Sequence, residues 1–264
     1  MKTVFNRLPY RALTPGKGVY FISDLHLGAP YSNDTVEKEK RVVRFLDLIK
    51  DKADTLFMLG DIIDYWFEYK SVVPKGYIRF FGKLAELADR GVRIVWIIGN
   101  HDIWLSDYFP SQFNIEIYDG VVIQKIGNRC FFLSHGDGLG DIPPMFAFIR
   151  SVFRNKVCQK LFSGIHPRWT IPFALAWSEH SRKKGMKNPD AESLPLLKSL
   201  IKYSEDFLSK NDERIDYFIF GHLHIFRREE LKGGAMLVIS GDWIGDDSNY
   251  IEYDGTNLYL RKFD

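Results

Sequence analysis

The chain contains little cysteine and no long hydrophobic run. Cys130 and Cys158 are the two cysteines among 264 residues, too few for a disulfide framework, so a reduced, cytoplasmic protein is expected. No apolar stretch approaches the roughly 20 residues that cross a bilayer. The opening residues MKTVFNRLPYRALTPGKG also lack the apolar segment of a secretory signal. We therefore expect neither a membrane-spanning nor a secreted protein.

The composition shows no bias toward a disordered, fibrous or coiled-coil protein, since 45% of the residues are hydrophobic and 27% are charged. Aromatic residues make up 15% of the chain, enough for a sizeable core with rings left for a binding surface. The net charge of +2 is unevenly distributed, because residues 144–187 contain nine bases and one acid. A basic segment on an otherwise acidic chain favours an anionic partner, and a solvated basic face is the alternative.

Strand-like and helix-like segments alternate in the first hundred residues. Residues 19–23, 55–59 and 92–98 are short apolar runs typical of strands. Between them, residues 35–50 and 77–90 repeat apolar side chains at helical spacing. This order predicts parallel strands joined by crossover helices, because parallel neighbours need a long connection.

The second half of the chain predicts hairpins on either side of a helical segment. Gly127-Asn128 separates two strand-like runs, and Gly233-Gly234 and Asp254-Gly255 do the same near the end of the chain. Residues 143–212 carry no strand signal. We therefore expect an α/β core of residues 1–142 and 213–264, into which residues 143–212 are inserted as a helical cap.

Five expected strands share one feature: polar residues of metal-ligating types follow the strand directly. The five motifs are DLH from Asp24, GD from Gly60, GNHD from Gly99, HGD from His135 and GHLH from Gly221. Ligands bind at the carboxyl ends of the strands in open α/β sheets, so these side chains are expected to converge. If the segments are extended, residues i and i+2 face the same way, so Asp24 and His26 can hold one ion, and His222 and His224 can point at one site or bridge two adjacent ones. The glycines at 60, 99 and 221 would let the backbone turn sharply.

Imidazoles, carboxylates and an amide form a mixed nitrogen and oxygen donor set. Such a set suits Mn²⁺, Fe²⁺, Co²⁺ or Zn²⁺ better than Mg²⁺ or Ca²⁺. The donors are too many for one ion with open coordination and fit two ions that share a carboxylate. Two ions roughly 3.5–4 Å apart can bind a phosphoryl group, generate hydroxide and stabilise in-line displacement. The motifs therefore predict a two-metal phosphohydrolase.

In this order, the motifs DLH, GDIID, GNHD, SHGD and GHLH resemble those of the calcineurin-like metallophosphoesterase superfamily. The resemblance implies a four-layer α-β-β-α sandwich with two ions at the strand ends. It implies that Asp24, His26 and His224 hold the first ion, that Asn100, His135 and His222 hold the second, and that Asp61 bridges them. His101 would contact a phosphoryl oxygen or protonate the leaving group, and Asp102 would accept the other ring N–H of His101.

The motifs SDLHLG and GDIIDYWFEY, with the basic and aromatic cap, are most similar to the UDP-2,3-diacylglucosamine pyrophosphatase group of lipid A synthesis. That resemblance implies hydrolysis to UMP and 2,3-diacylglucosamine 1-phosphate, two Mn²⁺ ions and a peripheral position on the inner face of the inner membrane. It implies substrate contacts at Asn100, His101, Asp141, Ser181 and Lys187. The sequence GNHD departs from this group, whose best-known members read GNRD, so leaving-group handling can differ at His101.

Several residues keep two interpretations. Asp137 can form a turn or act directly, and Trp66, Phe67 and Tyr69 can wall the site or lie in the core. The cap aromatics can hold acyl chains or pack the cap helices together. His166 and His180 are expected to be structural, because neither follows a strand.

Two other functions remain as alternatives. One is a phosphodiesterase for another nucleotide or for nucleic acid, tethered by the basic cap, although no base-stacking motif is present and no nucleic-acid partner is expected. The other is a non-catalytic scaffold on the same fold, which the complete set of ligand types disfavours.

Overall fold

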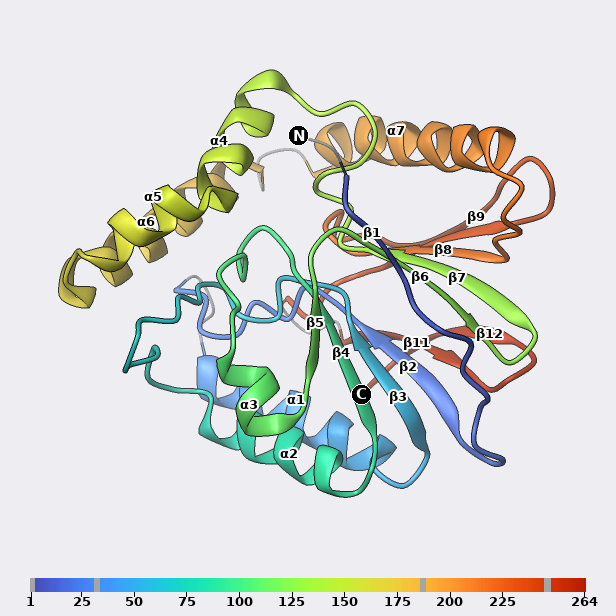
Figure 1. The fold of residues 1–264 in the computed structure, drawn as a ribbon, viewed down its shortest axis with the longest axis horizontal. Helices are drawn as coiled ribbons and strands as arrows, with labels where there is room; N and C mark the ends of the chain where they lie inside the picture. Colours follow the sequence, from blue (N-terminus) through green and yellow to red (C-terminus); the bar gives the residue numbers. More distant parts are fainter. Residues whose placement is uncertain (1–2, 31–33, 186–188, 245–247) are drawn as a thin grey trace.

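Two six-stranded sheets lie face to face in the computed structural model (Figure 1). The structure describes residues 3–30, 34–185, 189–244 and 248–264, with the side chain of 177 and those of 179–193 left out. In the order of their pairing, the strands of the first sheet are β1 (Phe5–Arg7), β6 (Val121–Ile126), β7 (Arg129–Ser134), β8 (Tyr217–Phe220), β10 (Met236–Ser240) and β9 (Phe226–Glu230). Those of the second sheet are β12 (Leu258–Lys262), β11 (Asn249–Tyr253), β2 (Gly18–Ile22), β3 (Ala53–Met58), β4 (Arg93–Ile97) and β5 (Glu116–Tyr118).

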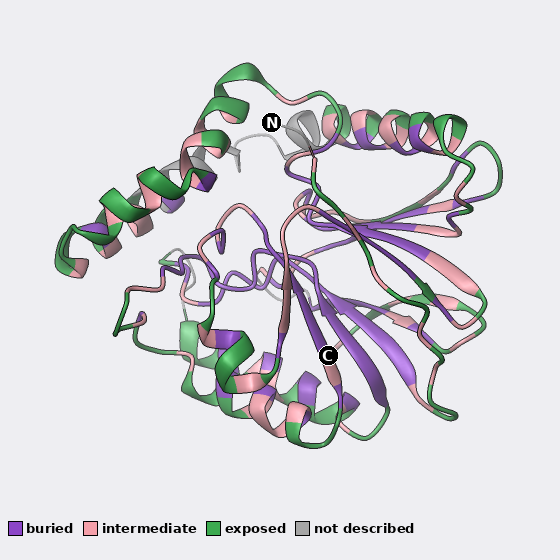
Figure 2. Ribbon diagram, viewed as in Figure 1, coloured by how far each residue is buried: buried purple, intermediate pink, exposed green. Residues whose placement is uncertain are grey.

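Both faces of the second sheet are buried, which explains why its central strands are apolar throughout. In β3, Leu56 and Met58 face the helices α1 (Thr35–Ile49) and α2 (Ile78–Asp89), whereas Phe57 faces the first sheet. The short helix α3 (Tyr108–Phe113) packs on the same outer side, where Phe109 is fully buried. Figure 2 shows the buried strands between more exposed helices.

The outer face of the first sheet is covered by α7 (Pro189–Lys210). Leu197, Leu200 and Phe207 recur at helical spacing on α7 and pack on Phe132 and Phe218 of the sheet. The layers are therefore α1–α3, second sheet, first sheet and α7. This arrangement confirms the expected α-β-β-α sandwich.

The segment 143–212 is divided differently from the expectation. The helices α4 (Pro144–Arg154), α5 (Lys156–Ser163) and α6 (Pro167–Gly185) project beyond the sandwich, whereas α7 belongs to its outer layer (Figure 1). An amphipathic pattern predicts a helix with an apolar face but does not indicate which surface that face covers. Among the described residues, no helix is long and apolar enough to cross a membrane.

The predicted strand pairings are confirmed. β2, β3 and β4 are parallel, and the hairpins at Gly127-Asn128, Gly233-Gly234 and Asp254-Gly255 are antiparallel. The sequence did not predict β1, β5 or α3, which are three to six residues long and too short to show a period. The carboxyl ends of β2, β3 and β4 meet at one edge of the second sheet, and β7 and β8, also parallel, end beside it.

Candidate metal centre

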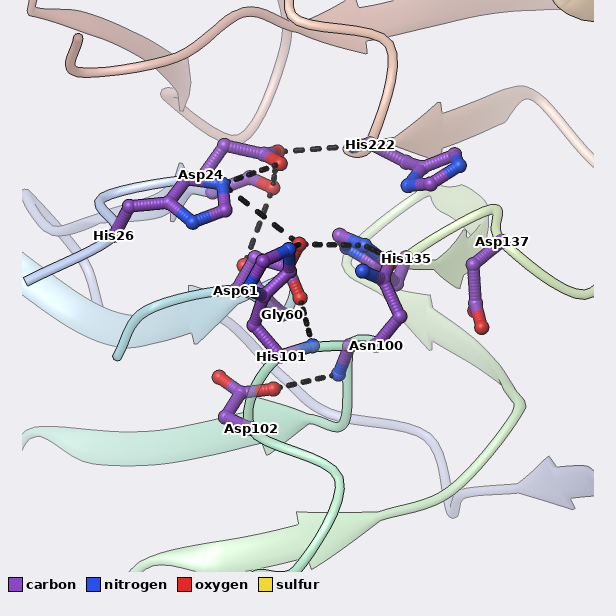
Figure 3. Close-up of polar contacts among 12 residues, drawn as sticks. Asp24, His26, Gly60, Asp61, Asn100, His101, Asp102, His135, Asp137 and His222 are labelled. Carbon is purple, nitrogen blue, oxygen red and sulfur yellow. Dashed lines mark hydrogen bonds and ion pairs between the residues drawn. The ribbon is translucent and has the colours of Figure 1, made fainter. Parts of the chain in front are cut away.

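The side chains that follow the five strands converge in one place (Figure 3). Asp61 lies between the Asp24–His26 pair on one side and His135 on the other (Figure 3). Three groups of ligand atoms, each within 4.8 Å of one another, form there: Asp24 with His26 and His224, His26 with Asp61 and His101, and Asp61 with His135 and His222. The groups are linked by shared members, as expected of two neighbouring ion sites.

Each of the two carboxylates has one oxygen fixed by the backbone and the other directed inward. Asp61 Oδ1 accepts the His101 backbone N–H at 2.8 Å, and Asp24 Oδ2 accepts that of His222 at 2.9 Å. Asp61 Oδ2 lies 3.7 Å from His26 Nε2 and 3.4 Å from His135 Nε2. The backbone thus fixes the direction in which each inner oxygen points.

The inner oxygen of Asp24 is the clearest sign that a cation fits here. In the part of the chain that the structure describes, Asp24 Oδ1 is buried without a hydrogen-bond partner. It lies 3.7 Å from His26 Nε2 and 3.6 Å from His224 Nε2, too far for hydrogen bonds. Two donors that each bind one ion at about 2.0–2.2 Å lie roughly 3–4 Å apart, so these separations suit a shared ion. The residues present therefore fit divalent metal.

The imidazoles are oriented for the same purpose. His26 Nδ1 lies 2.9 Å from Asp64 Oδ1, His224 Nδ1 lies 2.9 Å from Asp242 Oδ2, and His135 Nδ1 lies 2.8 Å from the Leu59 carbonyl oxygen. Because all three partners are acceptors, each Nδ1 carries a proton, and Nε2 is the ring nitrogen turned inward, able to ligate once it is deprotonated. His135 Nε2 also lies 3.0 Å from Asn100 Oδ1, which places the amide oxygen beside the group of Asp61, His135 and His222.

Sequence reasoning missed Asp64 and Asp242. Asp64 is the last residue of the GDIID motif, three positions after Asp61. Asp242 follows β10 as Ser240-Gly241-Asp242, the same succession of strand, glycine and acid found at other strand ends. Both signals were present in the sequence, but nothing local indicates that these acids contact imidazoles and not an ion.

The backbone at the centre is in an uncommon conformation. Asp24, His26, Asp61, His222 and His224 all have positive φ, between 43° and 68°. The expected extended backbone is therefore wrong, although Asp24 and His26 still bring ligand atoms into one group, as expected. Left-handed backbone costs about 1–3 kcal/mol per residue and persists where the surroundings enforce it. The strain therefore gathers at the residues that converge on one point.

The motif glycines are needed more because a side chain would not fit than because the backbone must be flexible. Gly60 has a φ of +88°, but Gly99 and Gly221 do not adopt such a conformation. A Cβ atom on Gly99 would overlap the Asp61 carboxylate and lie 2.5 Å from the Asp61 nitrogen. Glycine at position 99 is therefore required for the close approach of the two strand ends.

The electrostatics of the cluster favour positive charge inside it. Burial would lower the pKa of His135, but the Asp61 and Asp24 carboxylates outweigh burial and raise this pKa to about 10. Burial would raise the pKa of Asp61, yet the His135 and His101 rings hold it well below the usual value. Without metal, a proton on His135 balances the carboxylates, and a divalent ion would compete with that proton.

The comparison with protein families agrees with this geometry. The profile of the calcineurin-like phosphoesterases matches residues 18–226. The chain belongs to this family. It is therefore a metal-dependent hydrolase, and divalent ions are its cofactors.

Three relatives of this calcineurin-like phosphoesterase align along nearly the whole chain, and each is named UDP-2,3-diacylglucosamine hydrolase. The protein from Porphyromonas gingivalis is 34% identical over 257 residues, which cover 93% of this chain and 97% of the relative. The protein from Ralstonia nicotianae is 28% identical over 260 residues, covering 97% and 92%. The protein from a serogroup A strain of Neisseria meningitidis is 25% identical over 244 residues, covering 90% and 95%.

One expected contact in the phosphoesterase site is wrong. Asp102 was expected to accept the ring N–H of His101, but its oxygens accept the backbone N–H groups of Ile62 and Gly99 and the Trp96 indole N–H. His101 Nδ1 instead lies 3.0 Å from the main-chain oxygen of Asp64. The Asp102 side chain turns back into its own loop, where two backbone donors and a buried indole need an acceptor. Burial and the nearby Asp61 raise the pKa of Asp102 to about 6.

Asp137 and two of the basic cap residues take part in ion pairs that connect the cap to the core. Arg150 Nε donates to Asp137 Oδ2 at 2.8 Å, and Arg154 pairs with Asp119 at 3.1 Å. These two arginines hold α4 on the core and are not open for an anionic partner. Asp137 thus has a structural partner on the cap.

The remaining predicted residues lie in different places. Asp141 lines a cavity of about 150 Å³ that reaches His222. Lys187 and the side chain of Ser181 lie outside the described residues, as does the side chain of His180. His166 is exposed on the cap, and Trp66 is fully buried in the core. Phe67 packs on Phe162 of α5, which places it at the base of the cap.

Proposed function

We propose that this chain hydrolyses the pyrophosphate bond of UDP-2,3-diacylglucosamine to UMP and 2,3-diacylglucosamine 1-phosphate, a step of lipid A biosynthesis. The observation that carries the proposal is the alignment of a hydrolase of that name over 93% of the chain, cap included. The converging ligand set beside a cap with exposed apolar side chains supports the same substrate class.

We propose two Mn²⁺ ions as the cofactors. Asp24, His26 and His224 would hold the first, Asn100, His135 and His222 the second, and Asp61 both. When bound, the ions supply Lewis-acid polarisation of the phosphoryl oxygens and activation of water as the nucleophile. The mixed donors favour a borderline ion such as Mn²⁺ over Mg²⁺.

His101 is proposed to act on the leaving group. Its Nδ1 donates to the Asp64 carbonyl oxygen at 3.0 Å, and its Nε2 lies 3.9 Å from Asp61 Oδ2, facing the centre. The ring is thus held at one nitrogen, and the other can give a proton to the departing phosphate oxygen. Asp102 would act by holding the loop that carries His101.

The cap is proposed to comprise α4–α6 and to receive the glycolipid. Asp141, with its cavity reaching His222, stands where the cap begins and would contact the sugar phosphate together with Asn100. Ser181 and Lys187 remain proposed substrate contacts. The apolar side chains Phe146 and Leu196 line the same cavity and suit an acyl chain.

The proposed activity is tested by product analysis. Protein stripped of metal with a chelator should be inactive, and Mn²⁺ should restore release of UMP from UDP-2,3-diacylglucosamine. UDP-glucosamine without acyl chains serves as the control and should react much more slowly, because it cannot use the cap. Equal rates on both substrates, or faster cleavage of a nucleic-acid diester, would exclude the glycolipid proposal.

We also propose that the cap rests on an anionic membrane, at the inner face of the inner membrane. Exposed apolar side chains recur every three or four residues on each cap helix: Met145 and Phe148, Val157 and Leu161, and Trp169 and Phe173. Lys156, Lys160 and Arg168 are exposed on the same helices. Apolar stripes with neighbouring bases are typical of proteins that lie on anionic lipid.

Membrane binding is tested by sedimentation with vesicles of phosphatidylglycerol and phosphatidylethanolamine. The double substitution Trp169→Glu and Phe173→Glu is expected to reduce the bound fraction at least about fivefold. Each change removes apolar area that would be buried in the membrane and adds a negative charge that anionic lipid repels. Ile78→Glu is the matched control, since Ile78 is 79% exposed but lies on α2. Equal loss of binding in both variants would argue against a surface specific to the cap.

A further inference from the structure

Residues 64–69, here called the joint segment, contact the cap helices through three side chains. Phe67 packs on Phe162 of α5 with ring centroids 5.0 Å apart. The Tyr69 hydroxyl is hydrogen-bonded to the Thr170 hydroxyl of α6. Two turns further along α6, the Ser178 hydroxyl donates to Asp64 Oδ2 at 2.8 Å. The cap therefore rests on the segment that directly follows the Asp61 turn.

The contact at Asp64 differs from the other two because its far side reaches the metal centre. Asp64 Oδ1 accepts the His26 Nδ1–H at 2.9 Å and lies 3.4 Å from His101 Nδ1. Asp64 and Ser178 are 2% and 4% exposed, so both ends of the contact are buried. A chain of hydrogen bonds thus runs from the cap helix α6, through one carboxylate, to a proposed ligand of the first ion.

Loss of the Ser178 hydroxyl would change the orientation of the Asp64 carboxylate more than it would change the position of the cap. Removing one donor weakens the hydrogen bonding on that side of a buried carboxylate, and the group then rotates toward the donors that remain. Those donors include the His26 ring, whose Nδ1 lies 2.9 Å from Oδ1. Rotation of Asp64 would move the His26 ring away from the orientation in which Nε2 faces Asp24 and Asp61.

We propose that Ser178 is a positioning residue that couples the seating of the cap to the affinity of the first ion site. With the cap seated, Ser178 holds Oδ2 of Asp64, which keeps Oδ1 on His26. By linkage, an ion that favours this His26 orientation also favours the seated cap. Metal loading and closure of the cap over the glycolipid then support each other. The inference rests on the proposed metal-holding role of His26.

The test compares Mn²⁺ binding by metal-free wild-type protein and by Ser178→Ala, measured by calorimetry without substrate. Removing a group that orients a ligating histidine costs about 10–100-fold in metal affinity. Ser178 acts on His26 through one additional hydrogen bond, so a smaller loss of about threefold to tenfold is expected. The visible spectrum of bound Co²⁺ should also change, because it reports ligand geometry.

Thr170→Val is the matched control. Thr170 is 3% exposed and also joins α6 to the joint segment through a hydroxyl, but the ring of its partner Tyr69 packs on Phe67 and not on a proposed ligand. This variant is expected to bind Mn²⁺ as the wild type does. A second comparison uses Asp64→Asn, in which Ser178→Ala should add no further loss, since the effect passes through Asp64.

The outcomes separate this inference from the proposed function. Wild-type protein that binds no divalent metal would overturn both. Wild-type binding with an unchanged Ser178→Ala affinity would overturn the coupling alone, and so would equal losses in Ser178→Ala and Thr170→Val, which would indicate general loosening of the cap. A Ser178→Ala effect that persists in the Asp64→Asn protein would also overturn it.

Discussion

Gly99→Ala is expected to inactivate the enzyme although glycine 99 carries no chemical group. The new Cβ would overlap the Asp61 carboxylate and lie 2.5 Å from the Asp61 nitrogen. The Asp61 carboxylate must then shift, which moves Oδ2 from its place between His26 and His135. A displacement of about 1 Å in a catalytic group can cost about a hundredfold in rate, so a fall in kcat of at least about a hundredfold is expected.

The metal content of Gly99→Ala should fall with its activity, because Asp61 is proposed to serve both ions. Gly82→Ala is the matched control. Gly82 is exposed on α2, has ordinary backbone and has no atom near its added Cβ. This control should keep full activity and gain about 0.5–1 kcal/mol in free energy of unfolding, since alanine favours a helix. A Gly99→Ala protein with wild-type kcat and two bound ions would show that Asp61 can shift without consequence.

His101→Ala is expected to lower kcat by about 10²–10⁴-fold, the usual contribution of a general acid. His101 is not one of the proposed ligands, so the variant should still bind two ions per chain. The loss should be much smaller on a nitrophenyl ester of UMP, because that leaving group departs without a proton. His166→Ala, which removes an exposed cap histidine, should leave kcat unchanged.

The comparison of the two substrates decides the role of His101. Equal losses on the pyrophosphate and on the nitrophenyl ester would assign His101 to binding of phosphoryl oxygens and not to proton transfer. Loss of one ion in His101→Ala would instead identify His101 as a ligand, which its place beside His26 and Asp61 would allow.

The fold was predictable where one face of each element repeats apolar residues over several positions. β3 and β4 are buried on both faces and appear in the sequence as apolar runs, and the hairpin turns carry glycine. The role of α7 was not predictable. Leu197, Leu200 and Phe207 define an apolar face, but the sequence does not indicate that this face packs on the first sheet. β1 and β5 have three residues each, fewer than any periodic signal requires.

At the site, the sequence predicted that the ligand-type side chains converge but not how their backbone and rings are oriented. Each strand ends in a ligand type, and parallel strands bring such ends to one edge. The left-handed backbone of Asp24 and His26 depends on hydrogen bonds made across the structure, such as the one from the Asp24 backbone N–H to the Gly60 carbonyl oxygen. The partner of the His101 ring was missed for a similar reason: Asp102 is the next residue in the sequence, but packing brings the Asp64 carbonyl oxygen, 37 positions away, to the ring instead.

The strained backbone at five of the proposed ligands has a consequence for how much of this protein a cell keeps. An ion that binds the folded chain and not the unfolded one offsets that strain and shifts the folding equilibrium. Chains without their ions would unfold more often and be degraded sooner. Scarcity of divalent metal would then reduce the number of enzyme molecules as well as the activity of each one.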